Sequence, residues 1–476
     1  MENSNNDKLS AAYVISMLAL GLFMVNLDAS IVNIVLPTFA RTFFVDTAEV
    51  SRVVLSYLLS FSGFLLIFGR LSDMRGANKI FGLGFLVFSI TSIMCALSTS
   101  LFMLEIARFL QGIGAAMLAS TYGAIVIQKL PAEMRGRAFG FITVAGGAGF
   151  AMGSPIGGFL VKYFSWRWIF WINIPIGIFA LLASKRLIGQ KNSCRESSSD
   201  FDMIGAFLSF TGLALLTYLL NTGKNYGLLS PVVITCSILF ILVFMLFIVK
   251  ELRHKAPLLD MGLFSNKHLC LALVSNLAVV MTLDGLSFMF PFFFELARGM
   301  SPDKIGLLLM IAPLLSLVIS PIAGYMADKK GSRLVCIAAA ALLCLATAMI
   351  CFFDASSNIC YILTALSIFG AALAMFFTAN SCLLMSHAPE GREGTTSALI
   401  SFNANLGTLV GVCIFESIFS FGFPPGLVSG PAAIALPHVS RGFSHGAMLA
   451  FAICMLAFFA SFMAREKSRF VQPDCV

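Results

Sequence analysis

Uninterrupted apolar runs recur along the whole chain, and most are about 20 residues long, enough to cross a bilayer as a helix. Hydrophobic residues make up 59% of the 476 residues, and charged residues only 11%. A soluble chain of this length would need a far more charged surface. Because the runs are continuous rather than alternating, they favour helices as the spanning elements. The sequence therefore predicts an all-α integral membrane protein.

The apolar runs predict about 14 transmembrane helices. They lie at 12–37, 49–68, 80–98, 101–128, 138–161, 167–184, 203–220, 231–249, 269–294, 304–326, 334–353, 359–385, 395–421 and 445–464. The polar segment before the first run carries one lysine and lacks the basic region and cleavage site of a signal peptide. The first run is also too long for the apolar region of such a peptide. We therefore expect it to remain in the mature protein as a membrane span.

Lysine and arginine are distributed unequally between the two sides of the predicted helices. With the N-terminus placed inside, the inner segments hold 22 of these residues and the outer segments hold 8. This excess predicts that both termini are cytoplasmic and that the protein is a multi-pass plasma-membrane protein, in the inner membrane if the source is bacterial. The net charge of +8 fits this inner bias together with anionic lipid, so we expect no nucleic-acid partner.

The sequence contains none of the patterns that are typical of metal sites or catalytic centres. The 12 cysteines include no C-x-x-C pair, and the five histidines show no ligand spacing. No nucleotide-hydrolysing loop and no nucleophile motif occur. We therefore expect no metal, no cofactor and no enzymatic activity.

A short charged segment occurs twice, each time after the second span of a predicted half. GRLSDMRG (Gly69 to Gly76) and GYMADKKG (Gly324 to Gly331) share the pattern G-x-x-x-D-x-x-G, with basic residues at the end. Parallel repeats are common in transporters and preserve sidedness. Two six-helix halves would place the copies about 180 residues apart, and the two additional spans within 203–249 account for the larger separation. The repeat therefore indicates two six-helix bundles plus two inserted helices.

This repeat predicts three parts of the chain. They are an N-terminal six-helix bundle at 1–190, cytoplasmic links with two inserted helices at 191–268, and a C-terminal six-helix bundle with a cytoplasmic tail at 269–476. Within the repeated segments a glycine permits a tight turn, and an aspartate beside basic residues can form ion pairs that break and re-form. The candidate hinge residues are Gly69, Asp73, Arg75, Gly76, Asp328 and Gly331. The alternative is that these charges only mark the inner face.

Five segments resemble the major facilitator superfamily, specifically its 14-helix drug:proton antiporters. GRLSDMRGANK (69–79) is similar to the loop signature of the superfamily, and LEIARFLQGIGAA (104–116) to the pattern of its fourth helix. LDASIVNIVLP (27–37) resembles the first-helix signature of the 14-helix family. SWRWIFWINIPIG (165–177) and GMSPDKIGLLLMIAP (299–313) resemble that family near the sixth helix and at the start of the C-terminal bundle. The resemblance covers nearly the whole chain and implies a two-bundle transporter.

The chain departs from that family at three places. In the fifth-helix segment GFAMGSPIGG, Ser154 stands at the usual proline position and Pro155 follows it. Arg52 stands where the second helix usually begins with tryptophan, and Glu295 replaces a usual glutamine. The shifted proline leaves the direction of transport open.

Small residues repeat along the fifth span at four-residue spacing. Gly149, Gly153 and Gly157 form this stripe, with Pro155 and Gly158 beside it. Such stripes let helix backbones approach closely within a membrane. The stripe predicts either static packing or an interface that slides and seals, with the proline adding a kink.

Charged residues inside spans are costly and are candidates for function by default. The candidates for proton coupling or cation binding are Asp28, Glu105, Arg108, Asp284 and Glu416. Glu105 and Arg108 lie three residues apart on one helical face, so we expect them to neutralise each other in part. Resemblance to the family links Arg108 to proton coupling, while its position fits a structural ion pair equally well.

The two aspartates differ in their sequence surroundings. Asp28 lies about 200° around its helix from Asn26, so we expect it to face a neighbouring helix, as a structural anchor or as a proton site. Asp284 lies about 15 residues into its span, near mid-membrane, with no basic residue within one turn. Because burial disfavours the charged form of a carboxyl, Asp284 could bind a proton or a cationic substrate. The alternative is a protonated acid that only bonds a neighbouring helix.

Uncharged polar residues inside spans are candidates for substrate contact. Asn26, Ser30 and Asn33 share one stripe of the first helix and predict a substrate-facing wall. Asn380, Asn403 and Asn405 are candidates for binding a ligand or for hydrogen bonds between helices.

These observations predict a secondary active transporter that exports small amphipathic or cationic compounds by alternating access, coupled to protons. The expected partners are a small-molecule substrate, protons and membrane lipids, and we expect a monomer. Two alternatives remain open. One is an exporter of one defined metabolite, such as a siderophore or a lipid-like molecule, and the other is a membrane receptor that has lost transport.

Overall fold

The structure is a computed structural model, and it describes residues 2–188, 203–226, 230–253, 261–389, 393–421 and 436–465. These residues form helices joined by short connections, and no strand occurs among them. Within the described ranges, thirteen helices are long and apolar enough to cross a membrane. The predicted span 167–184 corresponds to α7 (Trp168–Trp171) and α8 (Asn173–Ile188), whose apolar stretch ends at Ala183 and is shorter than the others.

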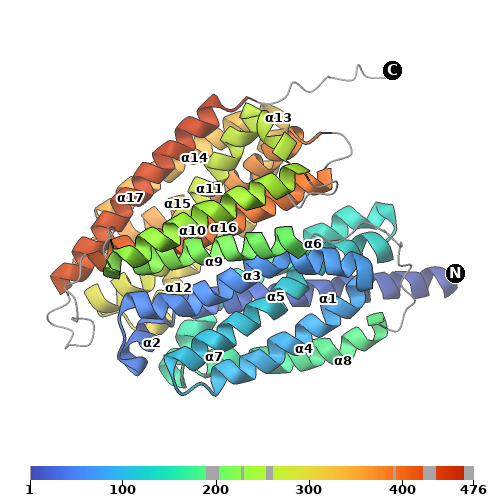
Figure 1. Cartoon of the computed structure of the whole chain (residues 1–476), viewed down its shortest axis with the longest axis horizontal. Helices are drawn as coiled ribbons and strands as arrows, with labels where there is room; N and C mark the ends of the chain where they lie inside the picture. Colours follow the sequence, from blue (N-terminus) through green and yellow to red (C-terminus); the bar gives the residue numbers. More distant parts are fainter. Residues whose placement is uncertain are drawn as a thin grey trace.

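The helices of the first half gather in the lower part of Figure 1. They are α1 (Glu2–Asn33), α2 (Leu36–Phe43), α3 (Thr47–Arg75), α4 (Ala77–Ala96), α5 (Leu101–Lys129), α6 (Ala132–Tyr163), α7 and α8. Side chains fix where two of them begin. Asp46 accepts a hydrogen bond from the amide of Glu49 at the start of α3, and Ser100 accepts one from Met103 at the start of α5.

The second half repeats the helix pairing of the first half. It consists of α11 (Lys267–Phe292), a π-helical turn η2 (Phe293–Ala297), α12 (Pro302–Leu309), α13 (Ile311–Lys330), α14 (Ser332–Cys351), α15 (Ile359–Ser386), α16 (Glu393–Phe421) and α17 (Leu436–Met463). In the first half α1 packs on α6, α3 on α5, α4 on α5 and α4 on α8. In the second half α11 packs on α16, α13 on α15, α14 on α15 and α14 on α17 in the same way.

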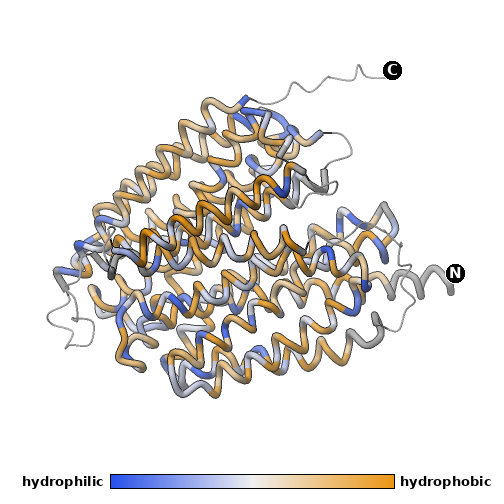
Figure 2. The backbone as a smooth tube through the Cα atoms, viewed as in Figure 1, coloured by the Kyte–Doolittle hydropathy of each residue, from blue (hydrophilic) through white to orange (hydrophobic). Residues whose placement is uncertain are grey.

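Two inserted helices cross the front of the view in Figure 1, between the two halves. They are α9 (Met203–Tyr226) and α10 (Pro231–Arg253), and a short 3-10 helix η1 (Met261–Ser265) precedes α11. α9 packs against α3 of the first half and α16 of the second half. α10 is apolar along its length (Figure 2) and exposes large side chains such as Ile238 and Met245. This exposure fits a helix whose outer surface contacts lipid.

The boundaries expected between the three parts of the chain, at 190/191 and 268/269, stay a prediction. Residues 191–202 lie outside the described ranges.

The two repeated charged segments form matching turns. Gly76 follows α3 with φ 93° and ψ 122°, and Gly331 follows α13 with φ 88° and ψ 140°. Their amides donate to the carbonyls of Ser72 and Ala327. Because positive φ strains any residue with a Cβ, glycine fits both positions, and the predicted tight turn at Gly76 is confirmed.

The other candidate hinge residues lie on the helices before these turns. Gly69 and Arg75 belong to α3, and Asp328 is exposed in the last turn of α13. Asp73 also belongs to α3, but its side chain lies outside the described part of the chain. The ion pairs expected of a hinge therefore stay a prediction.

Besides the span 167–184, two predicted spans are interrupted rather than continuous. The span 12–37 divides into α1 and α2 at Ile34 and Val35, and the span 304–326 divides into α12 and α13 at Met310. A proline follows each break, at Pro37 and Pro313. Proline lacks an amide hydrogen and disfavours helical geometry in the residue before it, which explains why the helices end there.

Candidate functional site

A buried ion pair joins α1 to α5 in the first half. Arg108 Nη1 lies 2.5 Å from Asp28 Oδ2, and the side chains are 1% and 0% exposed. The guanidinium also lies over the ring of Tyr57, with Cζ 4.2 Å from its centroid. Asp28 therefore faces a neighbouring helix, as its position on α1 predicts.

Amide and hydroxyl side chains surround this pair. Gln111 accepts from Arg108 at 2.7 Å, and it donates to Asp28 Oδ1 at 3.1 Å and to Ser92 Oγ at 2.9 Å. Asn173 donates to Asp28 Oδ1 at 2.9 Å. Groups on α5 and α8 thus satisfy both carboxylate oxygens of Asp28. Because Asp28 lies on α1 and Ser92 on α4, the hydrogen bonds connect four helices, namely α1, α4, α5 and α8. Sequence reasoning did not single out Gln111 or Asn173, although both stand inside the quoted segments 104–116 and 165–177.

The predicted neutralisation of Arg108 by Glu105 is wrong. Arg108 points into the bundle toward Asp28, whereas Glu105 is partly exposed beside Arg52 and α9. Residues three apart on a helix differ by about 60° in direction, and this rotation is enough to place one inside and one outside. The roles of both residues in proton coupling stay predictions.

Asp284 has surroundings of a different kind. Its Oδ2 accepts a hydrogen bond of 2.6 Å from Thr408 Oγ1 on α16, and its side chain is partly exposed. Among the described residues it takes part in no ion pair. A carboxyl held by one hydroxyl can exchange its proton without leaving a buried cation unpaired. Asp28, in contrast, cannot be protonated without disturbing Arg108.

The amides of the second half hold helices together. Asn276 donates to Asn403 at 2.9 Å, and Asn380 donates to Asn276 at 3.4 Å, so the three side chains link α11, α15 and α16. Asn405 donates to the carbonyl of Ser401 on its own helix and is not part of this group. The arrangement of Asn380 and Asn403 favours the predicted alternative of interhelical hydrogen bonds. Asn276 was not among the predicted residues.

Glu416 lies on α16 with 0% of its surface exposed. It lies two turns beyond Thr408 along that helix and is not part of the Asp284 contact. The structure therefore separates the five predicted charged residues. Asp28 and Arg108 form a buried pair, and Asp284 is held by the hydroxyl of Thr408. Glu416 is buried elsewhere on α16, and Glu105 lies at the side of the bundle.

A cavity of about 50 Å³ lies where the two halves meet. Its lining comes from α1, α6, α11, α12, α13 and α15, namely Ser30, Asn33, Phe150, Ser154, Leu283, Ser287, Phe290, Leu308, Leu309, Ala312, Pro313, Leu366 and Phe369. Ser30 and Asn33 belong to the predicted substrate-facing stripe. Asn26, one turn before Ser30, instead donates to the carbonyl of Leu22 at 2.8 Å. The lining combines aromatic rings with a few hydroxyl and amide groups, but its volume is far below the roughly 300 Å³ or more of a small-molecule site. The cavity must therefore widen before it can hold such a ligand.

The glycine stripe of α6 faces α1 within the first half. A Cβ at Gly153 would lie 2.6 Å from Ser30 Cβ, and one at Gly157 would lie 2.6 Å from Ile34 Cγ2. A Cβ at Gly149 would collide with the carbonyl oxygen of Phe23. The predicted close packing is therefore present, and its partner is α1.

A second close approach joins α6 to α12 across the two halves. A Cβ at Gly158 would collide with the carbonyl oxygen of Pro302, and one at Gly306 would collide with that of Ser154. Pro155 lies in the interior of α6 at this contact, where its Cα would be 2.9 Å from a Cβ at Gly306. Residues 154–158 therefore form part of the interface between the halves.

Two ion pairs connect the halves at the same end of the molecule. Lys162 Nζ lies 2.9 Å from Asp303 Oδ2, and Arg41 pairs with Glu295 on the π-helical turn. Figure 1 shows α2 and α12 together at the left of the view, at this end. This end is the predicted outer end, so these contacts join the two halves on the predicted outer side. Glu295 is thus the partner of a cation on the opposite half.

Curated relatives resemble the chain over most of its length. Riboflavin transporter RibZ of Clostridioides difficile (strain 630) is 30% identical over 407 residues, covering 86% of this chain and 88% of the relative. Multidrug resistance protein Stp of Mycobacterium tuberculosis (strain ATCC 25618 / H37Rv) is 30% identical over 423 residues, covering 89% and 77%. Putative multidrug resistance protein MdtD of Pectobacterium atrosepticum is 31% identical over 406 residues, covering 85% and 86%.

Solved structures of transporters share the fold. A bacterial homologue of the human lysosomal transporter Spinster, in an inward-facing and occupied conformation, superposes with a TM-score of 0.68 at 14% identity, covering 96% of this chain and 97% of that one. A D-xylose–proton symporter gives a TM-score of 0.66 at 14% identity, covering 94% and 97%. The family points to a transporter rather than an enzyme. Because the model of the Major Facilitator Superfamily matches residues 18–412, the chain belongs to that family and is a multi-pass membrane transporter.

Proposed function

We propose that the protein exports small amphipathic or cationic compounds in exchange for protons. Asp284 carries this proposal, because it is a partly exposed carboxyl within a membrane span, and its side chain accepts a hydrogen bond from the hydroxyl of Thr408. Such a group can hold a proton or, after losing it, a cationic ligand. The names of Stp and MdtD, which concern multidrug resistance, support the substrate class.

The contacts between the halves support transport by alternating access. Two ion pairs and the approach of α6 to α12 join the predicted outer ends. Opening the central cavity outward requires these contacts to separate, so they stabilise the state that is closed on that side. We propose that proton binding and substrate release shift the balance between this state and an outward-open one.

The buried pair of Asp28 and Arg108 has a separate part in the proposal. Its hydrogen bonds fix the rotation of α1, and α1 carries Ser30 and Asn33 at the central cavity. We assign the pair to positioning the cavity wall. Direct proton transfer is assigned to Asp284.

A second candidate function is transport of one defined metabolite. The relative RibZ is named as a riboflavin transporter, and it covers most of this chain. Aromatic residues together with serine and asparagine at the central cavity could also contact a flat heteroaromatic ring. The protein in this case would recognise one ligand and show little response to other cations.

Reconstituted proteoliposomes distinguish the two candidates. Lipophilic cations, a neutral dye and riboflavin would be tested one at a time, with and without an imposed pH gradient. If the protein exchanges cations for protons, several of the cations should move against their concentration gradients when the proton gradient is imposed. This movement should stop when a protonophore collapses the proton gradient. Transport of riboflavin alone would favour the second candidate. Unchanged cation movement without a proton gradient would contradict proton coupling.

A further inference from the structure

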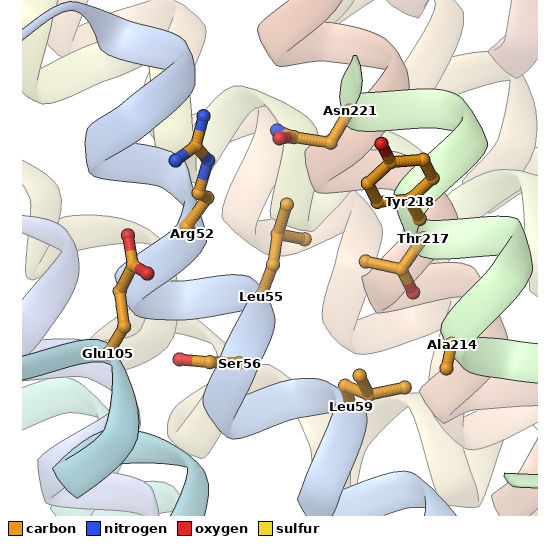
Figure 3. Close-up of a pocket in the computed structure, with 9 residues that line it drawn as sticks. All are labelled: Arg52, Leu55, Ser56, Leu59, Glu105, Ala214, Thr217, Tyr218 and Asn221. Atoms are coloured by element: carbon orange, nitrogen blue, oxygen red, sulfur yellow. The ribbon is translucent and has the colours of Figure 1, made fainter. Parts of the chain in front are cut away.

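A second pocket opens at the side of the first half, against the inserted helix α9 (Figure 3). Its volume is about 460 Å³, within the range that holds small ligands. It shares no lining residue with the central cavity. Its walls are α3, the start of α5 and the second half of α9. The transport mechanism proposed above does not use this pocket.

The pocket is polar at one end and more apolar at the other. Arg52 and Glu105 lie within the first two turns of α3 and α5, at the predicted outer end. Leu59 is seven residues beyond Arg52, which places it about 10 Å further along α3 at 1.5 Å per residue. Figure 3 shows the two charged groups at one end of the pocket, with Leu59 and Ala214 at the other. This arrangement matches a molecule with a polar head and an apolar chain.

The two charged side chains are available to a ligand. Both are partly exposed, and among the described residues neither forms a hydrogen bond or an ion pair, including with the other. The guanidinium of Arg52 and the carboxylate of Glu105 interact electrostatically without forming a salt bridge, and a cation and an anion in one mouth complement a ligand that carries both charges. Arginine binds phosphate oxygens through paired N–H donors, and a carboxylate binds a primary ammonium through charge-assisted hydrogen bonds.

The opposite wall is held in place by buried hydrogen bonds. Asn221 is 5% exposed and donates to Ser51 Oγ at 2.9 Å, which joins α9 to α3 beside the mouth. Thr217 is 7% exposed and donates to the carbonyl of Leu213. The pocket is therefore a formed feature between packed helices. Tyr218 on α9 lines the pocket and is 44% exposed on the outer surface of the helix, so the pocket can be reached from the side of the protein that faces the membrane.

We propose that this pocket binds a phosphatidylethanolamine molecule from the surrounding membrane. In this assignment Arg52 binds the phosphate, Glu105 binds the primary ammonium, and an acyl chain follows Leu55 and Leu59 along α9. The lipid joins α3 and α5 to α9. Because Ser417 on α16 donates to the carbonyl of Leu220 at 3.0 Å, the bound lipid also lies beside the contact of α9 with the second half.

Native mass spectrometry of the full-length protein in mild detergent tests the assignment. The probes are dioleoyl phosphatidylethanolamine, phosphatidylcholine and phosphatidylglycerol with equal chains, and dioleoylglycerol, which has no charged headgroup. Phosphatidylethanolamine is expected to bind most tightly, because a quaternary ammonium has no N–H to donate and phosphatidylglycerol has no ammonium. Equal binding of dioleoylglycerol would overturn the proposal and would indicate apolar filling only.

Two variants separate the roles of the charged residues. Arg52→Gln should weaken all three phospholipids by roughly tenfold, the scale of one charge-assisted contact. Arg52→Lys should retain much of the binding, which guards against an effect on folding. Glu105→Gln should keep phospholipid binding but remove the preference for ethanolamine over choline.

Arg441→Gln is the matched control for these variants. Arg441 is exposed on α17, outside the pocket, so its loss changes the net charge equally and should leave lipid binding unchanged. Phosphatidylethanolamine binding by Arg52→Gln at the level of the unaltered protein would contradict the proposal. Because the readout is lipid retention, this result is independent of whether the protein exchanges cations for protons.

Discussion

The hydroxyl oxygens of Ser30 and Ser154 lie 3.2 Å apart at the cavity between the two halves. Ser30 belongs to the predicted substrate-facing stripe of α1, and Ser154 stands where the similar antiporters carry a proline. The serine at this position therefore adds a hydroxyl to the wall that faces the cavity. It also supplies the carbonyl that approaches Gly306 of the other half.

Replacing either serine tests whether the hydrogen bond between the two hydroxyls positions this wall for the substrate. Ser30→Ala and Ser154→Ala each remove the same hydrogen bond, whose net contribution is about 1 kcal/mol. We expect each variant to weaken binding of a transported compound by about fivefold, and the double variant to be no weaker than the single ones. Equilibrium binding to the purified protein measures this. Additive losses would mean that the two hydroxyls act separately.

Asp284→Asn tests the proposed exchange site. The amide keeps the shape of the side chain and can still bond Thr408, but it cannot ionise, so we expect a folded protein whose gradient-driven export of cations falls at least about tenfold. Export of a neutral compound should persist. Asp284→Glu, which keeps the ionisable group, should retain part of the activity, and Asp354→Asn in an exposed connection is the control. Normal cation efflux by well-expressed Asp284→Asn would remove this residue from the mechanism.

A double-mutant cycle tests the buried pair of Asp28 and Arg108. Asp28→Asn leaves the guanidinium buried without its counter-ion, which should destabilise the protein by about 3–5 kcal/mol, and Arg108→Gln should have an effect of similar size. The double variant should recover much of the loss, because no unpaired charge remains. Thermal unfolding in detergent, followed by circular dichroism, measures the three variants. A double variant that is as unstable as the sum of both single ones would show that the pair itself contributes little.

Gly158→Val tests the contact between the halves at the predicted outer end. The added side chain would meet the carbonyl of Pro302, so we expect α6 and α12 to separate and a cysteine probe near the central cavity to react faster with an outside reagent. Gly140→Val is the matched control on the same helix, since a Cβ at Gly140 meets nothing within 4 Å. Equal labelling of the two variants would mean that the contact does not close the outer side.

Local patterns in the sequence predicted several features of the structure correctly. Apolar runs marked the helices, because an apolar stretch of the required length is a property of contiguous residues. The repeated glycines marked the turns at Gly76 and Gly331, because positive φ is a requirement of a single residue. The breaks at Met310 and before Leu36 were missed, although the nearby Pro313 and Pro37 were visible in the sequence.

Contacts between distant segments could not be predicted in the same way. The sequence identified Arg108 as a costly intramembrane charge, but it favoured Glu105 as the partner because that residue is near in the chain. The partner is Asp28, 80 positions away, and Gln111 and Asn173 complete its hydrogen bonds. Which side chains meet depends on the rotation of each helix about its axis. In a membrane, one face of a helix contacts lipid and the other contacts neighbouring helices, and both are apolar. The hydrophobic pattern of the sequence therefore does not determine the rotation.

The sequence by itself determined that this is an all-helical membrane protein with a duplicated turn and a small set of intramembrane charges. Those features follow from residue type and spacing within one segment. Only the tertiary structure decided that Gly153 faces α1 while Gly158 faces α12, and that Arg52, Glu105 and α9 enclose a pocket. These arrangements arise when separate helices pack. The energy of a close approach or of an ion pair depends on the surfaces of two helices at once, and the sequence of one helix does not say which surface of another helix it will contact.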